Sequence, residues 1–347
     1  MITKGLLLSL LAIFYGERKK LTLPSRRHCF MHTKWHSSCL GIVEKIGSQF
    51  PQPQVMLVVH STYASTINLR DSYGRLHSIV TKENAFHPAS LLLNAPEGGF
   101  LLKAREICVG SMACVHEDGL FFDCGLWVSF LGAKRVPPSD ESAPNVSALP
   151  QAILLRRELI LDSFQKKKNT SLQYIHTTRS TEIEPLFAPR FYATIEDLSH
   201  HIRKQDISQS IESIQSLVGF GPGSTPSGDD FLCGLLLSWC MYPDKESPYH
   251  RFTMELVTLL SMLLKDHKHI TTDISRMFLL LACDGLFSSS LLVLARSWDS
   301  READNRQYRE ALTVLSEVGH SSGLDAAYGM VYGLVQTTLC VARKEVS

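Results

Sequence analysis

Apolar residues change their spacing near residue 136 of the chain. Between Val55 and Phe130, short apolar runs alternate with turn signals such as Asp118-Gly119, which is typical of strands joined by hairpins. The runs that predict strands are Val55–Val59, Ser65–Leu69, Leu76–Val80, Phe100–Leu102, Ile107–Val115 and Leu120–Phe130. We therefore expect an antiparallel sheet curled into a small barrel or sandwich.

Beyond residue 150 the apolar spacing is that of helices. The predicted helices are Gln151–Gln165, Thr194–Val218, Asp229–Tyr242, Phe252–Leu264, Asp273–Cys283, Arg306–Val318 and Leu324–Ala342. The last is nearly continuously apolar, but Asp325 and the polar residues at 336–338 argue against a membrane span. Gly329 and Gly333 favour close packing against another helix instead. The fold class is α+β, a β-rich half followed by a helical half.

Composition and turn residues divide the chain into four parts. Residues 1–50 form an N-terminal extension that is poorly structured or amphipathic, and residues 51–136 form the β-rich domain. Residues 137–150, which are rich in proline and serine, predict a linker. Residues 151–347 form the helical domain, so the length corresponds to two domains.

The formal charge of +1 gives no indication of nucleic acid or membrane as a partner. Nine cysteines without a CxxC motif favour free thiols in the cytoplasm. The apolar segment Gly5–Tyr15 is long enough for the core of a signal peptide, but a basic cluster follows it and no cleavage site does. We prefer an amphipathic or extraneous segment there; a signal or anchor is the alternative.

The most informative motif is the glycine-rich loop from Gly219 to Asp230. One interpretation is a capped turn between helices, with Ser227 as N-cap and Asp230 completing a capping box. The other is a ligand loop whose backbone N–H groups bind phosphate or carboxylate. Asp229 and Asp230 would then hold Mg²⁺ beside a phosphate, or accept hydrogen bonds from a carbamoyl NH₂ group.

Two further segments place polar residues ahead of predicted helices. In Val318–Asp325, His320 is a candidate acid, base or oxyanion donor, and Ser322 is a candidate cap. In His269–Ser275, Thr272 is a candidate N-cap with Ser275 in the first turn. A third pattern, Cys29, His32, His36 and Cys39, has spacings that could surround zinc, but it lies in a low-complexity stretch and we do not assign a zinc site to it.

Three stretches occur together in one family. GFGPGSTPSGDDFLCG resembles the signature GxGPGLTPSGDDFLxG of the AllH-like family, and HITTDISRMFLLLACDG and EVGHSSGLDAAYG resemble its two other motifs. The resemblance extends from Val55 to Ala342 and includes Ile67-Asn68-Leu69 and Pro88-Ala89-Ser90. Ser224 departs from the family's leucine, and Cys283-Asp284 also departs from its pattern.

The resemblance implies a subunit associated with FdrA-like proteins in oxamate carbamoyltransferase. That reaction is the phosphorolysis of oxalurate to oxamate and carbamoyl phosphate in anaerobic allantoin breakdown. The alternative is a non-catalytic subunit whose motifs serve packing and contacts with an FdrA-type partner.

We expect the three motifs to form one site, with the loops around Ser227, Thr272 and Ser322 about a single cleft. Asp229, His320 and Ser322 are the candidate catalytic residues, and Asp229 and Asp230 the candidate Mg²⁺ ligands. The candidate residues for binding a carbamoyl or phosphate ligand are Gly221, Gly223, Ser224, Thr225, Ser227, Gly228, Asp230, Thr271, Thr272, Ser275 and Gly323.

Overall fold

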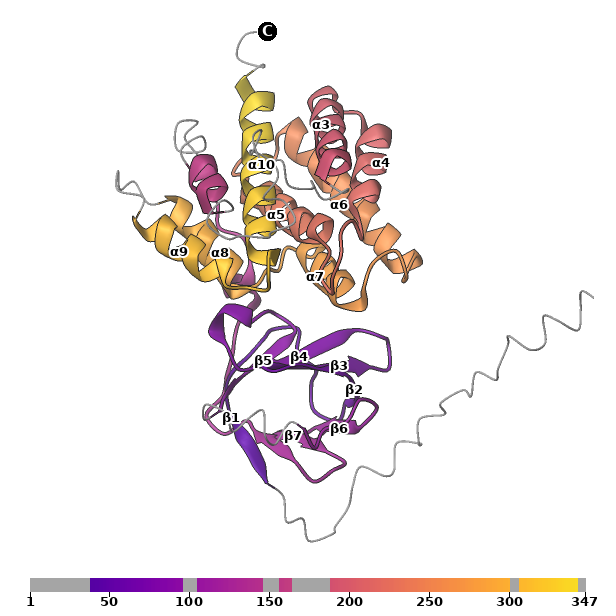
Figure 1. The fold of residues 1–347 in the computed structure, drawn as a ribbon, viewed down its shortest axis with the longest axis vertical. Helices are drawn as coiled ribbons and strands as arrows, with labels where there is room; N and C mark the ends of the chain where they lie inside the picture. Colours follow the sequence, from indigo (N-terminus) through magenta and orange to yellow (C-terminus); the bar gives the residue numbers. More distant parts are fainter. Residues whose placement is uncertain (1–37, 96–104, 146–155, 164–187, 300–305, 343–347) are drawn as a thin grey trace, which may run out of the picture. The chain divides into compact units, whose positions relative to one another are not determined.

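The computed structural model describes residues 38–95, 105–145, 156–163, 188–299 and 306–342 (Figure 1). The apolar segment Gly5–Tyr15, the predicted strand Phe100–Leu102 and three of the four zinc-spaced residues lie outside these ranges. No helix in the described ranges is long and apolar enough to cross a membrane.

Eight strands close into a barrel. They are β1 (Cys39–Ile46), β2 (Met56–Thr62), β3 (Thr66–Asp71), β4 (Leu76–Val80), β5 (Ser90–Asn94), β6 (Met112–Val115), β7 (Gly119–Phe122) and β8 (Trp127–Ser129). Their order is β5-β4-β3-β2-β6-β7-β8-β1, and an antiparallel pairing of β1 with β5 closes the ring. A short strand, β9 (Lys134–Arg135), pairs with β1 outside the ring. The predicted barrel is confirmed, but its sheet is not antiparallel throughout as expected, because β4 pairs with β5, and β8 with β1, in parallel.

Alternation of side chains fills the barrel. In β2, Leu57 and Val59 are buried in the core while Val58 between them is exposed, as expected for a strand with one face toward the interior. The same core takes Ile67 and Leu69 from β3 and Leu120 from β7. The polar positions between these residues face outward or line the cavity described below.

Three strands, β1, β5 and the short β9, were not predicted. β1 lies within residues 1–50, which were expected to form a poorly structured or amphipathic extension. Residues 39–46 are instead a strand of the barrel. β5 has four consecutive buried residues and therefore no apolar–polar alternation; it pairs with both β4 and β1. The predicted run Leu120–Phe130 is two strands, because the turn at Gly125, with φ of +86°, separates β7 from β8.

The helices are α3 (Ala188–Lys204), α4 (Ile207–Leu217), α5 (Ser227–Met241), α6 (Pro248–Asp266), α7 (Asp273–Cys283), α8 (Ser289–Arg296), α9 (Arg306–Ser316) and α10 (Ser322–Ala342), and residues 156–163 are also helical. The predicted helix Thr194–Val218 is two helices, because Gln205 has φ of +54° and Asp206 caps α4 by accepting from the Gln209 N–H. α8 was not predicted.

Residues expected to form a linker are partly packed. Pro138–Glu141 forms a 3-10 turn, η2, and the buried Glu141 carboxylate accepts from the Ser48 N–H at 3.1 Å. The Glu141 carbonyl accepts from the Phe287 N–H at 2.9 Å, so this turn contacts both the barrel and the segment before α8. The limits of the two domains stay predictions.

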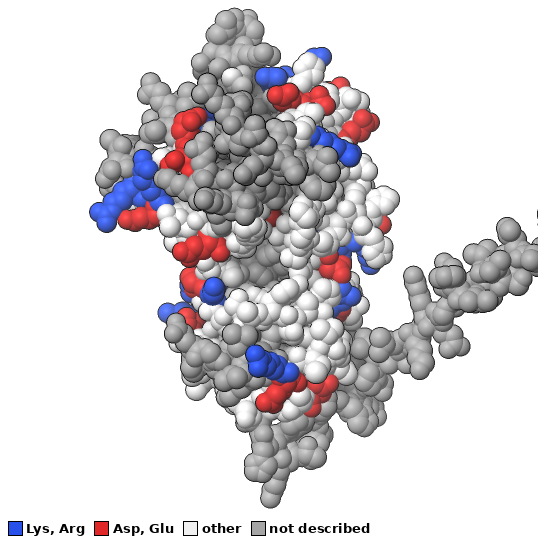
Figure 2. Space-filling model, viewed as in Figure 1, with Lys and Arg blue, Asp and Glu red and all other residues white. Residues whose placement is uncertain are grey.

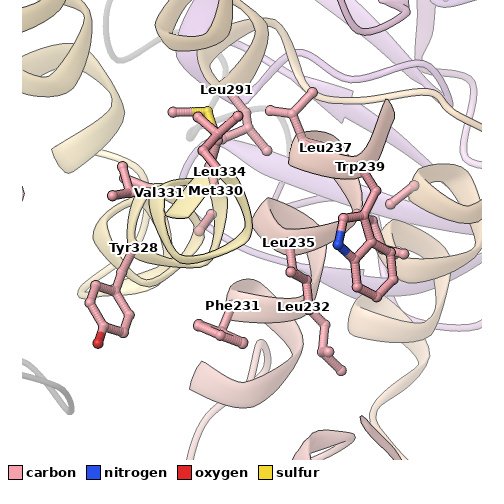
Figure 3. Packing of buried hydrophobic residues seen from close by; sticks show 14 of the residues in the cluster. Phe231, Leu232, Leu235, Leu237, Trp239, Leu291, Tyr328, Met330, Val331 and Leu334 are labelled. Atoms are coloured by element: carbon pink, nitrogen blue, oxygen red, sulfur yellow. The ribbon is translucent and has the colours of Figure 1, made fainter. Parts of the chain in front are cut away.

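Helices α5 and α10 pack where glycines replace side chains. A Cβ built on Gly234 of α5 would lie 1.8 Å from the Ala326 carbonyl oxygen, and one on Gly329 of α10 would lie 1.9 Å from that of Phe231. A Cβ built on Gly333 would lie 1.8 Å from the Ser238 hydroxyl oxygen. The close packing predicted from Gly329 and Gly333 is confirmed. Figure 3 shows the surrounding layer, with labelled side chains from α5, α8 and α10.

We predict that Gly234→Ala destabilises the protein. Alanine in a helix interior is ordinarily about 1 kcal/mol better than glycine, but here its methyl group would overlap the Ala326 backbone. Overpacking of this kind costs about 1–3 kcal/mol. Urea unfolding measures the difference, with Ser216→Ala at an exposed position of α4 as the control. Equal or greater stability of Gly234→Ala would contradict the proposed packing.

Candidate functional site

A cavity of about 380 Å³ lies between the barrel and the helices. Its barrel side is formed by residues of β3, β4 and the segment after β4, among them Asn68, Ser78 and His87. Its helical side includes Ser224, Thr225, Asp230, Ser322 and Gly323, together with apolar residues of α7 and α8. Four of the residues predicted to bind ligand and one predicted catalytic residue, Ser322, therefore line one cavity.

The first motif loop is shaped by its glycines. Gly219, Gly221 and Gly223 all have positive φ, between 71° and 109°, a region that only glycine enters readily. Gly228 permits a close contact, since a Cβ there would lie 2.1 Å from the Leu217 carbonyl oxygen. This conformation directs the chain from the end of α4 into the start of α5.

The predicted capping box is wrong. Pro226 occupies the N-cap position of α5, no side chain caps it, and Ser227 is the first helical residue and is buried. The fixed φ of proline suits the start of a helix. Ser322 is likewise the first residue of α10 rather than its cap. The acids and hydroxyls of these segments therefore make tertiary contacts instead of local ones.

Asp229 ties the first motif to the second. Its carboxylate is buried, with one oxygen accepting from the Gly219 N–H at 2.8 Å and the other from the Thr271 hydroxyl. Burial raises the pKa of Asp229, and the hydrogen bonds from Thr271, Gly219 and Ser275 oppose that shift. Both oxygens are therefore already engaged by the protein.

Thr272 makes a second tie. Its hydroxyl accepts from the Ser275 N–H at 3.1 Å and caps α7, as predicted. The same hydroxyl donates to the Ser224 carbonyl oxygen at 2.6 Å. A local cap is thus also a contact with the glycine-rich loop.

Ser322 brings in the third motif. Its hydroxyl lies 2.8 Å from the Thr225 hydroxyl, within hydrogen-bond distance. Together with the ties made by Asp229 and Thr272, this contact places the loops around Ser227, Thr272 and Ser322 at one location. The predicted convergence of the three motifs is confirmed.

Asp230 is the acid that faces the cavity. Its buried Oδ2 makes no hydrogen bond to another described residue. Burial raises the pKa of Asp230 well above its usual value, and the charges of Asp325 and Asp229 raise it further, while hydrogen bonds from Ser322 and Thr225 lower it. The site therefore contains a carboxyl group that favours its protonated form and has one unpaired oxygen.

The remaining predicted residues do not line the cavity. This group comprises Gly221, Gly223, Ser227, Gly228, Asp229, Thr271, Thr272, Ser275 and His320. Most of them shape or hold the loops. His320 is exposed and does not line the cavity. Its predicted catalytic role stays a prediction.

A two-acid Mg²⁺ site is not supported by this geometry. Asp229 is engaged by Gly219 and Thr271, which leaves Asp230 as the acid of the pair that lines the cavity. Among the described residues, no group of three or more His, Cys, Asp or Glu side chains is arranged to hold a metal ion. Cys108, Cys124, Cys233, Cys240 and Cys283 are free thiols.

Sequence reasoning missed the chemistry of the barrel wall. Ser78 donates to Asn68 at 2.7 Å, and Asn68 donates to Ser61 at 3.0 Å, which fixes the amide of Asn68 at the cavity. Burial lowers the pKa of His87 to about 3, and the charge of His77 lowers it as well, so His87 is neutral. The family resemblance at 67–69 and 88–90 pointed to this region without assigning it a role.

Comparison with family models addresses the segment that carries all three motifs. The model described as oxamate carbamoyltransferase subunit AllH matches residues 217–334. This segment matches the AllH family. Neither the comparison with curated proteins nor the comparison with solved structures gave a match. The AllH match confirms the resemblance over residues 217–334, which carry all three motifs.

The AllH segment begins at the end of α4 and ends within α10, so it contains the helical side of the cavity but none of the barrel. Figure 2 shows Lys and Arg interspersed with Asp and Glu on the face in view, with uncharged side chains between them.

We predict that Asp229→Ala lowers stability. The change leaves the Gly219 N–H and the Thr271 hydroxyl without their acceptor, which costs about 1–3 kcal/mol. Urea unfolding at neutral pH measures the loss, and Asp197→Ala, an exposed acid of α3, is the control. A variant as stable as the parent chain would show that Asp229 is not the tie between the loops.

We predict the opposite for the neighbouring acid, Asp230→Asn. A carboxyl group with a higher pKa in the folded than in the unfolded chain makes stability fall as pH rises between those two values. For Asp230 this interval begins near the ordinary value of 3.8 and extends well above it. The variant does not titrate, so above this interval it should be more stable than the parent chain.

The measurement is urea unfolding of both proteins as a function of pH. The advantage of Asp230→Asn should shrink as pH falls toward the ordinary value, because the parent carboxyl is then protonated in both states. Lower stability of the variant at neutral pH would contradict this account of Asp230.

Proposed function

We propose that the chain binds the carbamoyl group in a complex that phosphorolyses oxalurate to oxamate and carbamoyl phosphate. The observation that carries this proposal is the Asp230 carboxyl, whose Oδ2 makes no hydrogen bond to another described residue, beside the Thr225 and Ser322 hydroxyls in a cavity. The AllH match supports the reaction class. We further propose an FdrA-like protein as the partner subunit, and the cytoplasm as the location, where free thiols persist.

The chemistry requires a stabilised oxyanion and a proton donor. A phosphate oxygen attacks the carbamoyl carbon, the C–N bond to oxamate breaks, and the departing nitrogen takes up a proton. Of the Thr225 and Ser322 hydroxyls, which hydrogen-bond to each other, the one that accepts in that pair would donate to the oxyanion. Asp230, whose raised pKa favours the protonated form, would protonate the departing nitrogen.

The glycine-rich loop offers a place for the phosphate. Gly223 and Ser224 are exposed, and Ser224 lies at the cavity. Positive φ at Gly221 and Gly223 turns backbone N–H groups in directions that a regular helix does not allow, and such groups bind anions. We propose that phosphate approaches the carbamoyl carbon from this side.

A non-catalytic subunit is the second candidate function. It is favoured by the number of motif residues with a packing role, since Gly228 and Gly323 closely contact backbone carbonyls and Asp229 and Thr272 bind other loops. In that case the partner would carry out catalysis, and the motifs would hold the shape that the partner binds. Removal of a cavity hydroxyl distinguishes the two functions.

We predict that Ser322→Ala lowers carbamoyl transfer by the assembled complex by roughly 10²–10³-fold, the effect of losing one oxyanion donor. Carbamoyl phosphate formed from oxalurate and phosphate is measured after the chain is combined with FdrA-like subunits. Ser321→Ala is the matched control, because Ser321 is adjacent but does not line the cavity. Full activity of a correctly assembled Ser322→Ala complex would favour the non-catalytic alternative.

A further inference from the structure

The cavity has a large apolar part that the carbamoyl chemistry does not use. From α7 it is lined by Met277, Phe278 and Leu281, and from the segment before α8 and from α8 itself by Leu286, Phe287 and Leu291. Most of the exposed wall is apolar. Oxalurate is small and charged. An apolar wall offers no hydrogen bond or opposite charge to offset the free energy that such a ligand loses when it is dehydrated.

This wall is a packed surface rather than a loose gap. Met277, Leu281 and Leu286 form a buried cluster with Leu76 and Ala89 of the barrel side. Phe278 lies edge-on to the His87 ring, with 5.0 Å between ring centroids. Residues from both sides of the cavity thus hold the wall in place, so a ligand would meet a preformed apolar surface.

His87 adds a polar group to the opposite side. Its side chain is buried, and its Nδ1 makes no hydrogen bond to another described residue. The Ser90 hydroxyl accepts from the His87 N–H at 2.9 Å and donates to the His87 carbonyl at 2.7 Å, which fixes the backbone. A neutral imidazole places no charge at this end of the cavity, so an uncharged ligand group can lie beside it.

We propose that the cavity binds a carbamoyl compound with an uncharged, apolar substituent, that is, an N-substituted urea larger than oxalurate. The carbamoyl end would lie at Asp230, Thr225 and Ser322, and the substituent would lie on the α7 and α8 wall near His87. This inference rests on the proposed function for the carbamoyl end, and it extends that function by naming the substrate class.

The test is calorimetric binding of ethylurea, butylurea and hexylurea to the full chain, with oxalurate in parallel. Each methylene that reaches the wall should tighten binding roughly fourfold, from about 0.8 kcal/mol per buried CH₂. Oxalurate should bind more weakly than hexylurea. Binding that does not tighten with chain length, or that is tightest for oxalurate, overturns the proposal.

A filling variant locates the substituent. Ala85 lines the cavity on the barrel side and is half-buried, so Ala85→Leu should remove the gain from butylurea to hexylurea while ethylurea still binds. Ala133→Leu, at another half-buried alanine of the barrel and outside the cavity, is the control. An unchanged series in Ala85→Leu would place the substituent elsewhere and overturn the proposal.

The two proposals fail separately. Phosphorolysis of oxalurate by the complex without any effect of chain length on binding overturns the substrate class and leaves the proposed function standing. If binding of alkylureas depends on chain length but the complex transfers no carbamoyl group, the proposed function is overturned and the apolar ligand class stands.

Discussion

The site depends on the close packing of α5 against α10, which requires glycine at the points of contact. Gly234 and Gly329 let these helices approach until backbone atoms are in contact, and Gly333 leaves room for the Ser238 side chain. Because Asp230 lies in the first turn of α5 and Ser322 begins α10, this approach brings the start of both helices to one location. A larger residue at the crossing would separate the Thr225 and Ser322 hydroxyls, which are 2.8 Å apart.

Two adjacent acids in one motif have different roles because consecutive helical residues point in different directions. Asp229 points toward the second motif, where the Gly219 N–H and Thr271 hydroxyl use both of its oxygens. Asp230 points into the cavity and retains an unpaired oxygen. The first acid therefore stabilises the loop that positions the second, and only the second has a raised pKa together with access to a ligand.

The cavity needs the barrel as much as the helices. Arg70 of β3 pairs with Asp273 at the start of α7, and the Ser289 hydroxyl of α8 donates to the Glu83 carbonyl at 2.9 Å. These contacts hold α7 and α8 against the strands that carry Asn68 and Ser78. The family match covers only the helical side, so the strands that complete the cavity lie outside the matched segment.

The sequence by itself determined those features that depend on near neighbours. The Thr272 cap of α7 and the close packing at Gly329 and Gly333 follow from spacing and residue type, and so does the barrel followed by helices. Only the tertiary structure decided which acid faces the cavity, that Pro226 rather than Ser227 precedes α5, and that His87 and Asn68 belong to the site. β1 and β5 also required it, because β5 is buried on both faces and has no period to detect. The physical reason is the sequence separation of the interacting groups. A helix cap or a turn forms between residues a few positions apart, whereas burial and the pKa of a carboxyl group depend on groups far away in the chain.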